Sequence, residues 1–205
     1  MNKTTHIAIF ASGSGTNAEQ IMTHFADYKH VKVKMVFSNK EDAGVLERAE
    51  KWNVPSKSFT KAQFIEGEVQ KWLEEKEVNV VVLAGFVWKI PSGMVAAFEG
   101  RMVNIHPSLL HAYGGKGMFG NQVQEAVKAA GEKQTGITIH LVNVNYDDGA
   151  VLFQARTAID ADDTPADIAQ KVHLLEHQYL PRIIDALCKH CLLYTSLSPR
   201  ERQTP

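Results

Sequence analysis

The chain has 205 residues, of which 44% are hydrophobic and 22% are charged, a balance typical of one globular domain with a substantial core. Its formal net charge of -1 gives no electrostatic reason to expect a nucleic acid or an anionic membrane as a partner. It holds two cysteines, no apolar run of membrane-spanning length and no signal-peptide pattern, so a cytoplasmic protein without a disulfide framework is expected.

A short apolar run from Ile7 to Ala11 predicts a buried parallel strand, and a loop with two glycines follows it directly. The loop is Ser12-Gly13-Ser14-Gly15-Thr16-Asn17, in which Thr16 or Asn17 is expected to cap the next helix. Backbone N–H groups at a helix N-terminus bind phosphate, so the loop predicts a phosphate site. A glycine turn without a ligand is the alternative.

The same loop fits the dinucleotide-binding pattern G-x-G-x-x-A. A nicotinamide enzyme also requires an acidic residue at the end of the second strand, where it holds the ribose. Here the predicted second strand, residues 31 to 37, ends in Ser38-Asn39, and Glu41 and Asp42 come later, where they suit the start of a helix. A phosphate monoester is therefore favoured over NAD.

The next part of the chain alternates predicted helices with a strand. Helices are expected over residues 43 to 51 and 61 to 76, the second with Ile65 in its apolar stripe. The unbroken apolar run from Asn79 to Ala84 predicts a strand that is buried on both faces.

An aromatic loop, Gly85 to Pro91, leaves the carboxyl end of that strand. Ligands bind at such strand ends in open α/β sheets, so this loop suits a flat heterocycle. Phe86 and Trp88 are equally compatible with packing under the next helix.

The stretch from Val103 to Leu110 carries the candidate catalytic residues. An apolar start followed by a proline predicts a buried strand that ends and turns outward. Alternate residues of a strand point to the same side, so Asn104 and His106 are expected to face one reacting atom together. A lone histidine in a turn is usually structural, but Pro107 restrains His106 to an extended backbone, and the catalytic interpretation is favoured.

Four glycines fall between His111 and Gly120, which predicts a mobile loop that covers the site. A helix is expected over residues 121 to 130, and strands over residues 136 to 144, with one polar face, and 151 to 155.

The turn between these two strands contains adjacent carboxylates, Asp147 and Asp148. Such a pair usually bonds to the backbone of its own turn. Because His140 lies on the preceding strand, however, a carboxylate here could approach an imidazole, raise its pKa and orient it.

The final predicted helix starts at Thr164-Pro165-Ala166-Asp167, which combines a cap, a proline at the first position and an acid at the third. Glu176 lies beside the apolar stripe of this helix. It either contacts a ligand from the edge of the site or is simply exposed, and taken alone the exposed interpretation is favoured.

These motifs as an ordered set resemble the phosphoribosylglycinamide formyltransferases of purine synthesis, within the wider formyltransferase fold. The glycine loop with its asparagine points to this branch, because relatives that act on methionyl-tRNA differ there. The motifs are Ser12-Gly13-Ser14-Gly15-Thr16-Asn17, Leu83-Ala84-Gly85-Phe86, Asn104-Ile105-His106-Pro107-Ser108-Leu109-Leu110, Asp147-Asp148-Gly149 and Glu176-His177.

The resemblance implies an α/β fold, Rossmann-like and doubly wound, with a mostly parallel sheet flanked by helices in a single domain over residues 1 to 190. It implies transfer of the formyl group of 10-formyltetrahydrofolate, as co-substrate, to the amine of glycinamide ribonucleotide, with no metal. Asn104 would bond the developing oxyanion, and His106 would stabilise it or protonate the departing folate nitrogen. Asp147 would keep the histidine protonated and help to move protons through water.

The binding residues implied by the resemblance fall into three groups. Those for the substrate phosphate are Ser14, Gly15, Thr16 and Asn17; Glu176 would bind the ribose end; those for the folate are Phe86, Val87, Trp88, Lys89, Ile90 and His140.

Two features depart from the pattern. The family usually has His-x-His on the helix after the mobile loop, where this chain has Gln122 and Gln124, and glutamine cannot be protonated. The segment from Cys191 to Arg200 resembles a translated sequencing adapter, so residues 191 to 205 are expected to form a disordered tail, with the natural chain ending or interrupted near His190. The alternatives are a formyltetrahydrofolate hydrolase, another enzyme of the same fold, and a nucleotide-binding module with a degraded site.

Overall fold

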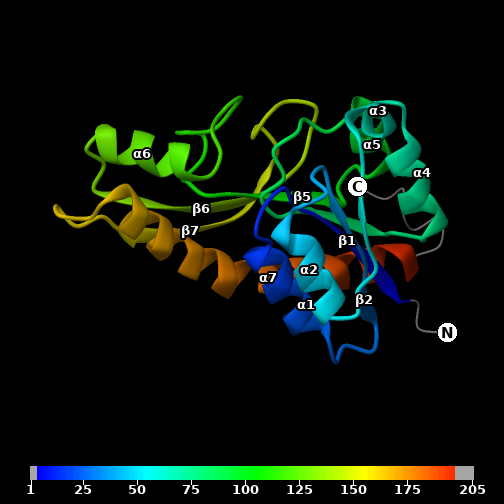
Figure 1. Cartoon of the computed structure of the whole chain (residues 1–205). Helices are drawn as coiled ribbons and strands as arrows, with labels where there is room; N and C mark the ends of the chain where they lie inside the picture. Colours follow the sequence, from blue (N-terminus) through cyan, green and yellow to red (C-terminus); the bar gives the residue numbers. More distant parts are fainter. Residues whose placement is uncertain (1–3, 197–205) are drawn as a thin grey trace.

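The computed structural model describes the backbone of residues 4 to 196 and the side chains of residues 4 to 189. Within these residues, seven strands form one sheet in the order β3-β2-β1-β4-β5-β6-β7 (Figure 1). The strands are β1 (Thr5–Phe10), β2 (Val31–Ser38), β3 (Ser56–Ser58), β4 (Val80–Leu83), β5 (Met102–His106), β6 (Gln134–Leu141) and β7 (Val151–Ala158). The helices are α1 (Thr16–Phe25), α2 (Gly44–Lys51), α3 (Lys61–Ile65), α4 (Glu68–Glu75), α5 (Ser92–Ala97), α6 (Asn121–Ala129) and α7 (Pro165–Ser196).

Strands β1 to β5 pair in parallel, whereas β6 and β7 add an antiparallel end to the sheet. The predicted α/β fold with a mostly parallel sheet is confirmed. Parallel strands are buried on both faces, which is why β1 and β4 read as continuous apolar runs.

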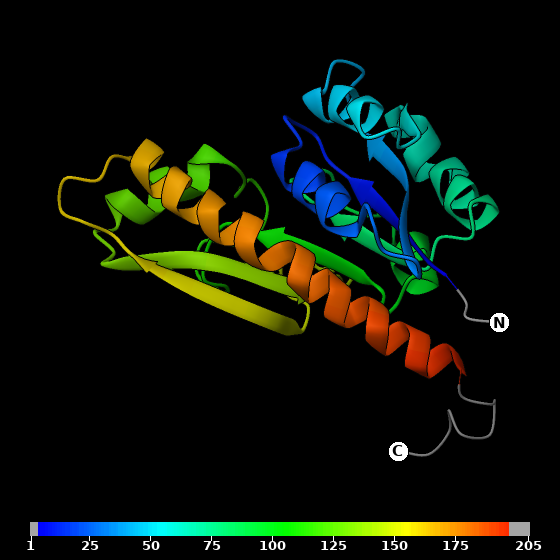
Figure 2. The same cartoon turned by 90° about the horizontal axis from the view of Figure 1, so that it is seen from below.

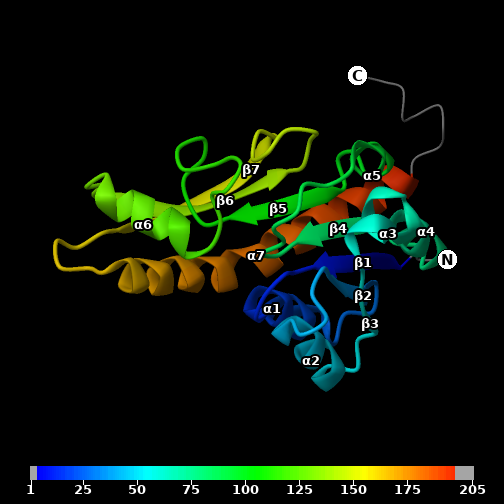
Figure 3. The ribbon, with the colours of Figure 1, turned by 45° about the horizontal axis from the view of Figure 1, so that its top comes forward.

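Two separate cores form on the two faces of the sheet, because alternate residues of each strand point to opposite sides. Ile7 and Ile9 pack in the core beneath α1, α2 and α7, whereas Ala8 and Phe10 pack in the core beneath α3, α4 and α5. Figure 2 shows α7 running lengthwise past α1 and the β6–β7 pair, and Figure 3 shows α1 and α2 well apart from α3, α4 and α5.

The helix expected over residues 61 to 76 is in fact two helices, so that prediction was wrong. Gly67, with a φ of 85°, stands between α3 and α4 in a conformation that ends one helix and starts the next at a new angle. The turn also directs Ile65 outward, where it is 63% exposed instead of packed in a core stripe.

The loops after β1 and β4 diverge, because the chain leaves β1 towards β2 on one side of the sheet and leaves β4 towards β5 on the other. This is the switch point at which open α/β sheets form a crevice for ligands. The two loops are bonded to each other: Ser12 N–H donates to the Gly85 carbonyl at 3.0 Å, and Val87 N–H donates to Ser12 Oγ at 3.1 Å.

The start of α7 matches the predicted capping pattern. Thr164 Oγ1 accepts from Asp167 N–H at 3.2 Å, and the Asp167 carboxylate accepts from Thr164 N–H at 2.9 Å. At its other end α7 remains helical to Ser196, which includes the first residues of the expected tail. Residues 197 to 205 lie outside the described part of the chain.

Candidate active site

Asn104 and His106 lie on the carboxyl half of β5, as the sequence predicted. The antiparallel pairing with β6 places Asn104 opposite His140 and His106 opposite Thr138. The polar face of β6 therefore turns towards the site, where Thr138 and His140 are 0% and 2% exposed.

The carboxamide of Asn104 contacts two residues that the sequence analysis also assigned to the site, His140 and Asp147. Its Nδ2 lies 3.1 Å from His140 Nε2 and donates to Asp147 Oδ1 at 3.3 Å. His140 Nδ1 lies 2.8 Å from the carbonyl of Leu141, which accepts a hydrogen bond from it. The reverse amide orientation would place an oxygen against the carboxylate, so the chemistry of the partners fixes this one.

His106 is buried between a loop carbonyl and a carboxylate. Its Nε2 lies 2.7 Å from the Tyr113 carbonyl oxygen, and its Nδ1 lies 3.6 Å from Asp147 Oδ2. Burial lowers the pKa of His106 below its ordinary value, although the charge of Asp147 acts in the opposite direction. The expectation that Asp147 keeps this histidine protonated stays a prediction, in which the charge of Asp147 acts against the effect of burial.

Asp147 is the carboxylate that turns into the site. Its φ of 49° directs the side chain inward, where Oδ2 accepts from Gly115 N–H at 2.8 Å. Burial alone would raise the pKa of Asp147, but the His140 imidazole and the Gly115 N–H outweigh it and lower that pKa below the ordinary value. Asp148 instead bonds the exposed side chain of Asn145 at 3.0 Å.

The glycine loop begins α1 without a side-chain cap, so the expected cap by Thr16 or Asn17 is wrong. The N-cap is Gly15, at a φ of 77° and with no side-chain hydrogen bond. A Cβ on Gly15 would come within 2.5 Å of Val45 on α2, so the position needs glycine for packing as well as for its backbone angle. The first-turn N–H groups receive no side-chain acceptor from this cap, as a phosphate cradle requires.

Glu176 connects this loop to α7. It is 4% exposed, which contradicts the exposed interpretation, and its Oε2 accepts from Asn17 Nδ2 at 2.9 Å. His173 Nδ1 lies 2.8 Å from the same oxygen, and this hydrogen bond raises the pKa of His173 above its ordinary value. Asn17 Oδ1 is buried and has no hydrogen-bond partner among the residues that the structure describes.

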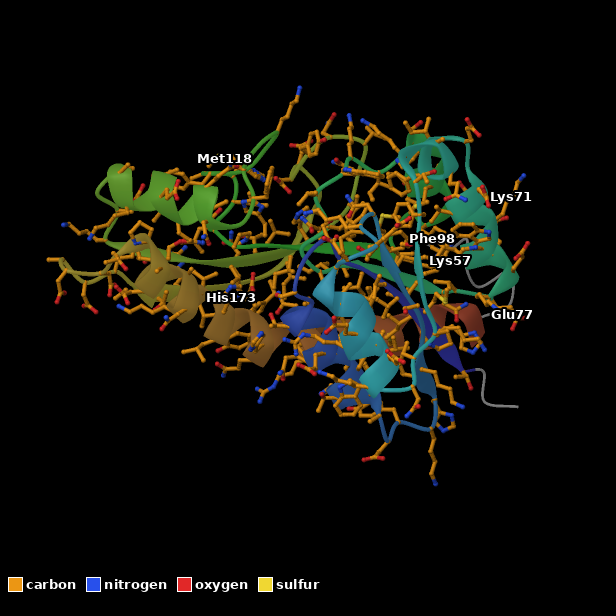
Figure 4. All side chains as sticks on the ribbon, in the orientation of Figure 1. Lys57, Lys71, Glu77, Phe98, Met118 and His173 are labelled. Carbon is orange, nitrogen blue, oxygen red and sulfur yellow. The ribbon has the colours of Figure 1, made fainter. Side chains whose placement is uncertain are left out.

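One cavity of about 620 Å³ brings these groups together, within the size range of small-molecule sites. Its lining includes the whole glycine loop, Asn104, His106, Asp147 and Glu176. Figure 4 marks two of its lining residues, Met118 on the loop before α6 and His173 on α7 beside α1.

The residues predicted for the folate divide into two sets. Phe86 and Val87 line the cavity, whereas Trp88, Lys89 and Ile90 do not. The Trp88 ring packs 6.0 Å from that of Phe59, and Ile90 is 7% exposed within the same core. His140 is behind Asn104 rather than on the cavity wall.

Sequence reasoning missed several residues of the cavity wall. Lys40 follows the carboxyl end of β2, a position that strand-end reasoning could have identified. Lys116, Met118 and Phe119 come from the glycine-rich loop, and Tyr146 comes from the turn before Asp147. Their side chains reach the cavity through loop conformation, for which the sequence carried no periodic signal.

The two glutamines of α6 differ in their surroundings. Gln122 is exposed, whereas Gln124 is 2% exposed, lines the cavity and donates from Nε2 to the Pro107 carbonyl at 2.8 Å. Gln124 thus holds the peptide between Pro107 and Ser108, directly after the residue that follows His106, and it does so without a titratable group.

Among the described residues, none of the helices is long and apolar enough to cross a membrane. Residues 4 to 189 also contain no group of three or more histidine, cysteine or acidic side chains arranged to hold a metal ion.

Comparison with known proteins places the chain in a family. The formyl transferase family model matches residues 5 to 184. The phosphoribosylglycinamide formyltransferase of Bacillus subtilis is 35% identical over 186 residues, which cover 88% of this chain and 93% of that protein. The chloroplastic enzyme of Arabidopsis thaliana is 36% identical over 190 residues, which cover 89% of this chain.

The chain spans less than two thirds of the length of the plant relatives, 65% of the Arabidopsis thaliana protein and 62% of that of Vigna unguiculata.

The fold of the chain is similar to those of solved structures over most of its length. The phosphoribosylglycinamide formyltransferase of Streptococcus pneumoniae has a TM-score of 0.79 at 35% identity, covering 91% of this chain and 99% of that one. That of Anaplasma phagocytophilum has a TM-score of 0.84 at 28% identity, covering 92% and 89%. The chain therefore belongs to the formyl transferase family, in the branch of the phosphoribosylglycinamide formyltransferases.

Proposed function

We propose that the protein transfers the formyl group of 10-formyltetrahydrofolate to the amine of glycinamide ribonucleotide. One observation carries the proposal: Asn104, His106 and Asp147 meet in a cavity whose wall also includes the uncapped glycine loop and Glu176. A phosphate held by that loop would direct the rest of the ribonucleotide towards the three side chains. The names of the relatives supply the substrate class.

The proposed reaction forms one bond and breaks one. The amine nitrogen attacks the formyl carbon, and the tetrahedral intermediate then expels the folate nitrogen, giving a formamide and tetrahydrofolate. The amine loses one proton overall and the departing nitrogen gains one. The site must therefore provide a donor for the oxyanion, an acceptor on the amine side and an acid on the folate side.

Three side chains fit these roles. Asn104 Nδ2 is a neutral donor for the oxyanion once it turns from its internal partners. His106 protonates the departing nitrogen, and the developing oxyanion favours its charge at the stage when charge is required. Asp147, whose low pKa makes it a weak base, accepts the amine proton through water and holds the imidazolium.

The two substrates occupy opposite parts of the cavity in this proposal. Ser14, Gly15 and Thr16 bind the phosphate through the start of α1, and Glu176, with one oxygen shared by Asn17 and His173, accepts from ribose hydroxyl groups. Phe86 and Val87 contact the pterin. The proposed compartment is the cytoplasm, although the two plant relatives are named chloroplastic.

The test is release of tetrahydrofolate, followed with and without glycinamide ribonucleotide. A transferase releases it only with the ribonucleotide and yields one formylated ribonucleotide per turnover. Release without the ribonucleotide, with formate as product, would identify a hydrolase. Binding of the ribonucleotide without any release would identify a module with a degraded site.

A further inference from the structure

The loop between β5 and α6 places two of its peptide groups on the candidate catalytic side chains. The Tyr113 carbonyl oxygen accepts from His106 Nε2 at 2.7 Å, and Gly115 N–H donates to Asp147 Oδ2 at 2.8 Å. The side chains of His106 and Asp147 are only 4% and 12% exposed. The loop therefore occupies the hydrogen-bonding positions through which these two groups would meet a substrate.

The remaining donor of the cluster is also engaged internally. Asn104 Nδ2 has two hydrogens, and they face two internal neighbours, His140 Nε2 at 3.1 Å and Asp147 Oδ1 at 3.3 Å. In this arrangement none of the three proposed catalytic residues has a free donor for an oxyanion. At least one internal contact has to break before the reaction begins.

The two peptide groups have the same polarity as the reacting groups of the proposed substrates. A carbonyl oxygen faces His106, where the formyl oxygen or the oxyanion would accept a hydrogen bond. An N–H group faces Asp147, where the attacking amine would donate one. The two peptide groups thus make with His106 and Asp147 the same kinds of hydrogen bond that the substrates would make.

The first part of the loop is held more firmly than the part from Tyr113 onward. In the first part, Thr138 Oγ1 donates to the Ser108 carbonyl at 2.7 Å and accepts from Leu110 N–H at 2.9 Å. These bonds are buried or partly buried. Beyond that point the Tyr113 hydroxyl donates to Glu132 Oε1 at 2.8 Å at an exposed site. Tyr113 has a φ of 57°, a conformation that costs a non-glycine residue free energy. Release is therefore easiest from Tyr113 onward.

We propose that residues 113 to 115 form a self-capping segment, which occupies the oxyanion and amine positions of the ligand-free site and leaves them when substrates bind. The inference rests on the proposed function, because that reaction supplies a carbonyl oxygen and an amine of matching polarity. Apparent affinity for the substrates is then reduced by the fraction of molecules that is capped.

The first experiment uses the wild-type protein labelled with ¹⁵N in its histidines and glycines. Free protein should show a His106 Nε2 that keeps its hydrogen and exchanges slowly with water, and a Gly115 N–H shifted by its carboxylate partner. Glycinamide ribonucleotide with tetrahydrofolate should change both signals together. A His106 Nε2 that exchanges freely in the ligand-free protein overturns the proposal.

The second experiment compares variants by calorimetric titration with glycinamide ribonucleotide. Tyr113→Pro cannot adopt a positive φ, so it should uncap the site and tighten binding by about tenfold or more, as expected when the competent state is a minor one. Tyr113→Phe loses only the bond to Glu132 and should move affinity in the same direction by less. Glu132→Gln keeps an acceptor and serves as the matched control, with affinity unchanged.

Unchanged or weaker binding by a folded Tyr113→Pro variant overturns self-capping. If that variant does not fold, the signals of the wild-type protein decide the question. A wild-type protein that does not bind the ribonucleotide contradicts the proposed function, whereas its ligand-free His106 and Gly115 signals still test the self-capping segment.

Discussion

At the level of single residues, burial lowers the pKa of His106. An imidazolium in this position loses most of its hydration, and Asp147 at 3.6 Å does not compensate for that loss, so the pKa stays below its ordinary value. A developing oxyanion adds a second negative charge beside the ring. The proton on His106 is then most stable at the stage of the reaction at which a general acid is needed.

Asp147→Asn tests this electrostatic arrangement. The variant keeps the shape of the side chain but removes the charge that raises the His106 pKa, so that pKa should fall further, as measured by NMR titration. Turnover should decrease by about 10²-fold to 10⁴-fold, the usual effect of losing one acid-base group, with both Michaelis constants changed little.

Asp148→Asn is the matched control, since the neighbouring Asp148 carboxylate faces the exposed Asn145 side chain instead of the site. It should keep near-normal turnover. The opposite pattern would assign the role to the wrong carboxylate, and normal turnover in both variants would contradict the mechanism. The sequence placed a carboxylate pair near His140, and the resemblance favoured Asp147; the φ of 49° at Asp147 is a backbone feature that residue type does not encode.

Among the elements, the glycine loop was predicted from the sequence, but the need for glycine at position 15 has a second cause that the sequence did not indicate. The sequence suggested that glycine allows the backbone to approach a phosphate, whereas Gly15 is also required by Val45 on the neighbouring helix. A contact between residues so far apart in the chain has no local pattern. By contrast, the break between α3 and α4 was visible in the sequence as Gly67 and was overlooked.

Gly15→Val should therefore destabilise the fold as well as weaken ribonucleotide binding. A positive φ and the crowding against Val45 each cost roughly 1 to 3 kcal/mol, so the urea midpoint should decrease clearly. Gly13→Ala is the control, because a Cβ there meets no atom within 4 Å, and its stability should stay within about 0.5 kcal/mol of wild type. Equal stabilities of the two variants would contradict the packing argument.

The glutamines of α6 allow another paired test. Gln124→Met keeps the length of the side chain but leaves the Pro107 carbonyl without its donor, at a cost of about 1 to 3 kcal/mol in unfolding free energy. Because Pro107 follows His106 directly, turnover should also decrease.

Gln122→Met changes an exposed position on the same helix and should leave both quantities unchanged. Denaturant unfolding and steady-state kinetics measure the pair. A Gln124→Met variant with wild-type stability would show that the bond to Pro107 contributes nothing.

For the molecule as a whole, the sequence was sufficient for the sheet apart from the short edge strand β3, and insufficient for the active-site loop. Apolar runs buried on both faces identify parallel strands, and strand-end motifs locate the crevice. The contacts of Tyr113 and Gly115 use peptide groups, which every residue has, so no residue pattern could indicate them.

The histidines also predict how stability depends on pH. Burial lowers the pKa of both His106 and His177 below 6.5, so near this pH the unfolded chain binds more protons at these residues than the folded chain does. The stability that the two neutral histidines contribute is therefore lost as pH falls below about 6.5. His173, with a raised pKa, contributes in the opposite direction, and its contribution to the stability of the fold is lost as pH rises through that raised pKa.

The contribution of His106 to the free energy of unfolding should therefore decrease on acidification, by at most about 1.4 kcal/mol per pH unit for one proton. Urea midpoints between pH 7.5 and 5.5 measure the slope, and His106→Gln should shift it in the direction that removes this contribution. A slope of the His106→Gln variant equal to that of the wild type would contradict the assignment.

The hydrogen bonds between the loops after β1 and β4 have a thermodynamic consequence. Ser12 bonds to Gly85 through its backbone and to Val87 through its hydroxyl, so the segment proposed for phosphate and the segment proposed for pterin share one rigid junction. Ordering either segment then lowers the cost of ordering the other, and the two ligands should bind with positive cooperativity. Linkage makes the effect reciprocal: the factor by which the folate tightens the ribonucleotide must equal the factor by which the ribonucleotide tightens the folate. Titrations with the two ligands added in both orders measure the two factors. Ser12→Ala removes the hydroxyl acceptor of Val87 and should bring the common factor closer to one.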